Sequence, residues 1–183
     1  MLRALVLTAC AALSMPAATA QVTVIGGGIA RECYETVKFG LGSLADAEKT
    51  CTRAIELEAM NLANKAATYT NRGVVRMRMG DYDAALEDYA VAKRIRPETG
   101  ATWLNEGAAL IFKKDYPAAL ASLEKAIELN SEDLYAAYYN RAIAREKTGD
   151  VEGAYFDFVR AKELNPGFER IDAQLARFTV GTN

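Results

Sequence analysis

Small residues recur along this chain at offsets of 34 and then 35 residues, and this repeat constrains the fold more than any other feature of the sequence. Within each unit the three small residues are separated by gaps of 12 and 7 residues. A period of this length is typical of helix–turn–helix solenoids. A Gly or Ala at a helix crossing lets two backbones approach closely, where a Leu would overpack the contact. The repeat therefore predicts antiparallel helix pairs, with these small residues at the crossings: Gly73, Ala85 and Ala92; Gly107, Ala119 and Ala126; Ala142, Ala154 and Ala161.

The short segments between the two predicted helices of each unit also repeat. They read Gly80-Asp81, Lys114-Asp115 and Gly149-Asp150. A glycine in the left-handed conformation ends a helix, and an aspartate can cap the next one. We expect Lys114, which stands in the glycine place, to cost up to about 1 kcal/mol.

Three pairs of stretches resemble the tetratricopeptide repeat. The resemblance covers residues 66–168 and implies an all-α, right-handed α-solenoid of helix pairs with a concave groove. It also implies a general role in holding a protein or peptide partner, although it names no particular partner. The stretches are Tyr69–Gly73 with Gly80–Ala85, Trp103–Gly107 with Asp115–Ala119, and Tyr138–Ala142 with Gly149–Ala154.

The pattern divides the chain into successive parts. We expect regular repeats at residues 66–99, 100–133 and 135–168, and a divergent N-terminal helical pair at residues 30–64. Residues 169–179 predict a capping helix, because one apolar stripe can cover the last repeat while a polar face meets water. Residues 21–29 carry three consecutive glycines, which resist helix formation, and are expected to form a flexible arm.

The first 20 residues have the pattern of a secretory signal peptide. Arg3 precedes an apolar run over residues 4–13, and Ala18-Thr19-Ala20 forms an A-x-A cleavage site. The apolar run is shorter than the roughly 20 residues that span a bilayer, so a membrane anchor is a weaker interpretation. We therefore expect a periplasmic or secreted protein that begins at Gln21. In an alternative interpretation Cys10 is lipidated, which would make the chain a membrane-anchored envelope assembly factor.

Cys33 and Cys51 are expected to form a disulfide. They lie symmetrically about Gly42, which belongs to a predicted turn, so an antiparallel helix hairpin places them at similar heights. An even pair of cysteines in an exported chain also favours a disulfide. Two free buried thiols, or a nucleophilic thiol, remain alternatives.

An asparagine occupies the same place on the first helix of each repeat: Asn71, Asn105 and Asn140. The resemblance implies that this helix lines the groove. An amide both donates and accepts hydrogen bonds, so this Asn ladder could pair with the main chain of an extended ligand. Alternatively, each Asn bonds within its own repeat. The apolar residues expected beside the ladder in the groove are Leu104, Ile111, Tyr139 and Ile143.

The remaining composition argues against several classes of function. The chain has no histidine and a formal net charge of -2 without a basic stripe, which disfavours nucleic acid, metal sites and most nucleophilic catalysis. We expect no cofactor and no enzymatic activity. The rival hypothesis is acid–base chemistry on Glu106, Asp115 or Glu146. A charged clamp for a C-terminal carboxylate is also disfavoured, because the places where the family would need Lys or Asn hold Thr70, Val74 and Ala136.

Overall fold

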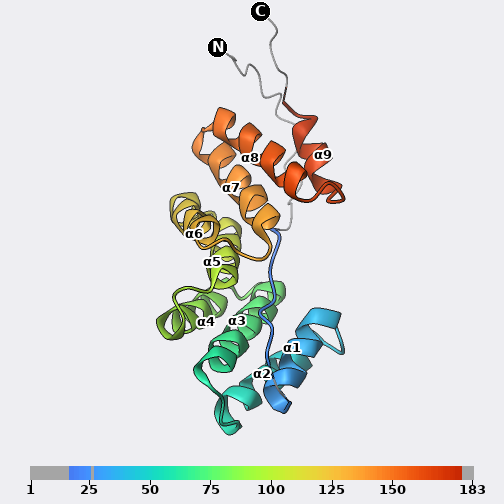
Figure 1. The fold of residues 1–183 in the computed structure, drawn as a ribbon, viewed down its shortest axis with the longest axis vertical. Helices are drawn as coiled ribbons and strands as arrows, with labels where there is room; N and C mark the ends of the chain where they lie inside the picture. Colours follow the sequence, from blue (N-terminus) through green and yellow to red (C-terminus); the bar gives the residue numbers. More distant parts are fainter. Residues whose placement is uncertain (1–16, 26, 179–183) are drawn as a thin grey trace, which may run out of the picture.

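The structure is a computed structural model that describes residues 17–25 and 27–178. All regular structure in these residues is helical, and successive helices stack into an elongated solenoid (Figure 1), as the repeat predicts. The helices are α1 (Ile29–Phe39), α2 (Leu44–Leu57), α3 (Leu62–Met79), α4 (Tyr82–Ile95), α5 (Gly100–Phe112), α6 (Tyr116–Glu128), α7 (Leu134–Thr148), α8 (Val151–Leu164) and α9 (Arg170–Leu175).

Three helix pairs form the regular repeats: α3 with α4, α5 with α6, and α7 with α8. The divergent pair expected at residues 30–64 corresponds to α1 and α2, which pack together, and both also contact α3. In the described residues no helix is both long and apolar enough to cross a bilayer.

The small residues lie at close helix contacts, as their spacing predicts. Ala85, Ala119 and Ala154 are completely buried. A Cβ added to Gly73 would lie 2.4 Å from the Tyr89 ring, and one added to Gly107 would lie 2.5 Å from Leu123 Cγ. Real Cβ atoms do not approach that closely, so these two glycines are required by the packing of each first helix on its partner.

The turns within the repeats have the expected geometry. Gly80 and Gly149 have φ values of 86° and 92°, and Lys114 adopts the same left-handed region with φ 63°. A side chain is strained in that region, so Lys114 carries the expected cost of up to about 1 kcal/mol. The side chains of Asp81, Asp115 and Asp150 each accept a backbone N–H three residues on and cap the following helix.

The C-terminal helix is shorter than the capping helix expected at residues 169–179. After α9 the chain leaves the helical path, and the Phe178 ring packs against Tyr155 and Phe158 at centroid distances of 5.7 and 5.9 Å. Ile171 is completely buried, so α9 still covers the last repeat.

The expectation of a flexible arm at residues 21–29 is wrong for most of that range. Residues 17–25, here called the N-terminal segment, run in an extended conformation beside α7, α5 and α3 before α1 begins (Figure 1). Val24 in this segment is completely buried. Gly28, with φ 95°, precedes the first residue of α1. The Glu58 carboxylate accepts the Ala30 N–H in the first turn of that helix at 2.7 Å.

The tight contact at Gly107 gives a test of the packing. Gly107→Ala should lower the free energy of unfolding by about 1–2 kcal/mol, although alanine has the higher helix propensity, because the new methyl group overpacks against Leu123. Urea unfolding would measure this loss. In a Leu123→Ala background the same substitution should become neutral or stabilising. A stabilising effect of Gly107→Ala alone would contradict the close contact.

Candidate functional site

The N-terminal segment lies along the first helices of the three repeats and is held there by the Asn ladder. Each of three asparagine side chains accepts the N–H and donates to the C=O of a single segment residue. The bonds join Asn140 to Ala18 (3.1 and 2.8 Å), Asn105 to Ala20 (2.8 and 2.6 Å), and Asn71 to Val22 (3.0 and 2.9 Å). Alternate residues of the segment therefore meet successive repeats, and the segment runs from the third repeat toward the first.

A fourth asparagine extends the ladder along α3. Asn64 accepts the Ile25 N–H at 3.1 Å and donates to the Ile25 C=O at 2.6 Å. It precedes Asn71 by seven residues, which is two helical turns or about 10.5 Å. Three residues of extended chain, from Val22 to Ile25, cover about 10 Å. The spacing on the helix therefore matches the spacing on the segment. The sequence analysis missed Asn64, although its place on the same face as Asn71 is visible in the helical period.

The three asparagines of the repeats are completely buried. A buried amide needs hydrogen-bond partners, because an unsatisfied group costs about 1–3 kcal/mol. Here the side-chain bonds to described residues go to the segment and not to each asparagine's own repeat. Side chains that pair with the main chain of an extended segment are what the ladder interpretation of these asparagines requires.

The segment also buries apolar side chains. Ala17 is 7% exposed, Ala20 is 1% exposed and Val24 is fully buried, whereas Ile25 is 77% exposed. Ala20 belongs to the apolar cluster that contains Leu104 and Ile111, and Ile143 packs against the edge of that cluster. Three of the apolar residues expected in the groove therefore belong to, or pack against, the cluster that contains Ala20.

Tyr139, the fourth apolar residue expected in the groove, packs into the interior of the third repeat. Its ring meets Phe158 and Phe168 at centroid distances of 5.6 and 5.2 Å. Burial raises the pKa of its phenol above the ordinary value. The side chain thus helps to join α7 to α8 and to the chain before α9.

The three positions of a charged carboxylate clamp hold uncharged side chains. Thr70, Val74 and Ala136, which stand where a charged clamp would need Lys or Asn, are all completely buried. The Thr70 hydroxyl makes a 2.9 Å hydrogen bond with Thr102, which ties α3 to α5. These three positions therefore supply no cation to a carboxylate.

Buried ion pairs, which the sequence analysis missed, hold the first and third repeats together behind the ladder. Arg72 pairs with Asp88 at 2.7 Å, and Arg141 pairs with Asp157 at 2.7 Å. Burial lowers the pKa of Arg72, but its hydrogen bond to Asp88 and the charge of that carboxylate outweigh burial, so the pKa lies above its ordinary value. The sequence does carry a sign of these ion pairs: in two of the three repeats an arginine stands directly before the small residue of the first helix.

The middle repeat replaces this ion pair. Glu106 stands at the position of the two arginines, accepts a hydrogen bond from the Ser122 hydroxyl at 2.9 Å and pairs with Lys93 at 2.5 Å. Of the other two carboxylates considered for acid–base chemistry, Asp115 caps α6 and Glu146 pairs with Arg177. All three have structural partners. Among the described residues, no group of three or more His, Cys, Asp or Glu side chains is placed to hold a metal ion.

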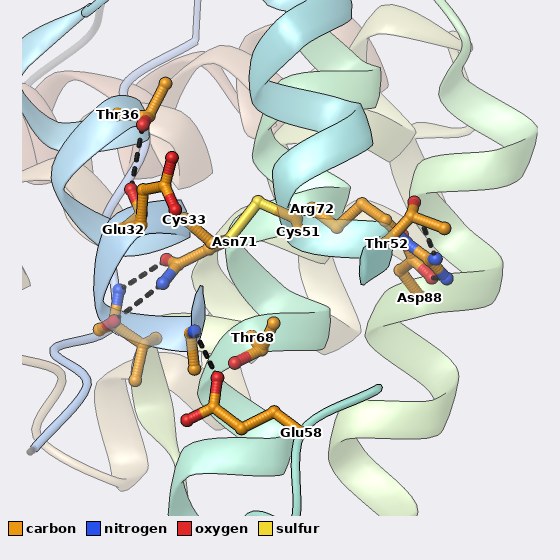
Figure 2. The surroundings of a disulfide bond; sticks show 12 residues. Glu32, Cys33, Thr36, Cys51, Thr52, Glu58, Thr68, Asn71, Arg72 and Asp88 are labelled. Carbon is orange, nitrogen blue, oxygen red and sulfur yellow. Dashed lines mark hydrogen bonds and ion pairs between the residues drawn. A yellow bond between two sulfur atoms is a disulfide. The ribbon is translucent and has the colours of Figure 1, made fainter. Parts of the chain in front are cut away.

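The two cysteines meet in the N-terminal helix pair, at the end of the solenoid where the first repeat lies. Cys33 on α1 and Cys51 on α2 are joined through their sulfur atoms, with the Cα atoms 4.8 Å apart and both side chains fully buried. Figure 2 shows this bridge close to Asn71, whose amide bonds the main chain of Val22. The bridge joins the two helices of the N-terminal pair.

Comparison with known proteins assigns the family. The sequence profile described as "Tetratricopeptide repeat" matches residues 66–99, 101–133 and 135–168, which together make up more than half of the chain. The chain belongs to the tetratricopeptide-repeat family.

Curated relatives match different shares of their own length. Tetratricopeptide repeat protein 36 of Homo sapiens is 29% identical over 139 residues, which cover 74% of this chain and 72% of that protein. Superkiller complex protein 3 of Homo sapiens is 31% identical over 131 residues, which cover 62% of this chain but only 8% of that protein.

Solved structures share the fold. The structure titled "MamA RS-1 ArsTM double mutant" is similar with a TM-score of 0.66 and 22% identity, covering 81% of this chain and 82% of that chain. The first TPR of Spaghetti (RPAP3), bound to the HSP90 peptide SRMEEVD, has a TM-score of 0.59 and 26% identity, covering 62% of this chain and 89% of that chain.

The bridge between α1 and α2 leads to a prediction. Reduction should cost about 3 kcal/mol in the chain-entropy model. It should also speed amide exchange in α1 and α2 before it affects α5 to α8. Thiol titration of the denatured, unreduced chain should find only Cys10 when the first 20 residues are retained, and no thiol when they are removed. Two additional thiols per chain would contradict the disulfide.

Proposed function

We propose that this protein is an exported, non-catalytic adaptor that holds an extended segment of a partner polypeptide in its concave groove. The observation that carries the proposal is the pairing of Asn71, Asn105 and Asn140 with the main chain of an extended segment. Hydrogen bonds to main-chain amides give affinity for many sequences, and side-chain packing between the asparagines gives selectivity.

Family membership supports a protein or peptide as the partner, and the related RPAP3 domain was solved with a bound peptide. The groove of this chain favours a different kind of peptide from the acidic SRMEEVD. Its ladder is amide rather than charged, and Thr70, Val74 and Ala136 offer no cation to a carboxylate. Affinity should therefore depend only weakly on salt, because few charges take part.

Export is proposed from Arg3, the apolar run after it and the Ala18-Thr19-Ala20 site. Arg3 and the run lie outside the described residues. The Cys33–Cys51 bridge supports a periplasmic or secreted location, since disulfides persist in oxidising compartments. The alternative, a lipid-anchored envelope factor, requires modification at Cys10, which also lies outside the described residues.

Asn105, the central member of the ladder, tests the proposed groove. Tagged protein would be purified from the native envelope, and co-purified proteins would be quantified by mass spectrometry. Asn105→Ala should weaken capture of the partner about fivefold, because about 1 kcal/mol of main-chain hydrogen bonding is lost. The melting temperature of the processed chain should change little.

The matched control is Glu124→Ala, which removes an exposed side chain from α6. It should capture the same proteins as the wild type. If Asn105→Ala lowers stability yet captures every protein at wild-type level, the asparagine is structural and the proposed groove is wrong.

The proposed export has its own measurement. The intact mass of the protein recovered from the native envelope should correspond to a chain that begins at Gln21. Recovery of a cytosolic chain that retains Met1 would contradict export, and an added diacyl mass on Cys10 would establish the lipid-anchored alternative.

A further inference from the structure

The N-terminal segment fills the groove that a partner would need. We infer that this segment is an internal ligand, and that cleavage after Ala20 frees the part of the groove around Asn105 and Asn140 for a partner segment of the same chemistry. The inference rests on the proposed function and adds the class of ligand, the part of the ladder that binds it and the condition under which it binds.

The cleavage site divides the bound segment between two pairs of contacts. Ala18 and Ala20 pair with Asn140 and Asn105, and both would leave with the signal peptide. Val22 and Ile25 stay attached to α1 and keep their pairing with α3. A processed chain therefore retains a filled site on α3 and presents an empty site on α5 and α7.

The side chains around the departing residues define the ligand. Ala20 is 1% exposed in the cluster that includes Leu104, Ala136 and Ala137, so a larger side chain at this place would overpack the groove. Ala17 is 7% exposed. The empty site should accept an extended, uncharged segment with small residues, Ala, Gly or Ser, in the places of Ala17 and Ala20.

The new N-terminus has a suitable environment. Gln21 lines a cavity of about 340 Å³ whose wall includes Arg96, Glu98 and Glu132, and Arg96 pairs with Glu98 at 2.6 Å. These three side chains carry a formal net charge of -1, which can offset the positive charge of the α-amino group that cleavage creates at Gln21. The processed chain can therefore keep residues 21–25 in place while the neighbouring site is empty.

The folded chain protects its own cleavage site. The carbonyl oxygen of the scissile bond, that of Ala20, accepts a hydrogen bond from Asn105 at 2.6 Å, and the residue is almost fully buried. A protease must reach an accessible, extended bond, so cleavage has to precede folding. A chain that folds unprocessed stays closed, because a tethered ligand acts at an effective concentration near the millimolar range.

The test uses the full-length, unprocessed chain from cell-free synthesis and a fluorescent peptide, blocked at both ends, with the sequence of residues 14–20. Ala20→Arg should expel the segment, speed amide exchange in residues 17–20, and bind the peptide at least about tenfold more tightly than the wild type. Ile25→Arg places the same charge on the segment at a side chain that is 77% exposed, and should bind as weakly as the wild type. Adding Asn105→Ala to Ala20→Arg should weaken binding about fivefold.

A milder opening variant guards against misfolding. Ala18→Pro removes the N–H that Asn140 accepts and should give an intermediate gain in peptide binding. Equal binding by the wild type and both opening variants would overturn the internal ligand, while leaving the proposed function intact. Opening variants whose segment amides exchange quickly but which bind no peptide would overturn the inferred ligand chemistry. The co-purification experiment with Asn105→Ala would then still decide the proposed function.

Discussion

The arrangement of this protein depends on the paired hydrogen bonds between buried asparagine amides and one extended stretch of main chain. An amide in a buried groove is costly unless both its donor and its acceptor are used, and here Ala18, Ala20 and Val22 use both. The solenoid places one such amide on each first helix at the repeat spacing. The same regularity that stacks the helices therefore builds a row of main-chain binding positions, and an extended chain satisfies them at every second residue.

The rest of the fold keeps that row in register. Gly73 and Gly107 let α3 and α5 approach their partner helices closely, and the Arg72–Asp88 and Arg141–Asp157 pairs tie α3 to α4 and α7 to α8. Asp88 also pairs with Arg76 at 3.1 Å, and Asp157 also pairs with Arg145 at 3.0 Å. Removing either buried carboxylate would therefore leave two arginines without that partner, so these pairs help to specify the arrangement of the helices. At the first end of the solenoid, the Cys33–Cys51 bridge joins α1 to α2.

The fold could be predicted from the sequence because its determinants are local and repeated. The spacing of Gly107, Ala119 and Ala126, and the cap at Asp115, each report on structure within a few helical turns. The Asn ladder could be placed on one face for the same reason. Its partner could not, because Ala18 and Asn140 are 122 residues apart and nothing local to either residue indicates the contact. The signal-peptide pattern also indicates that residues 17–20 are cleaved off rather than folded. The three consecutive glycines within residues 21–29 indicate a flexible arm.

The pairing of Asn105 with Ala20 is the centre of this account, and nuclear magnetic resonance of the side-chain amide tests it most directly. In the full-length chain the two Nδ2 protons of Asn105 should exchange slowly with solvent and show nuclear Overhauser effects to Ala20. The distance from Nδ2 to the Ala20 carbonyl oxygen, 2.6 Å, requires such contacts. Rapid exchange at Asn105 Nδ2, with no Overhauser effect to any residue of the segment, would contradict the account.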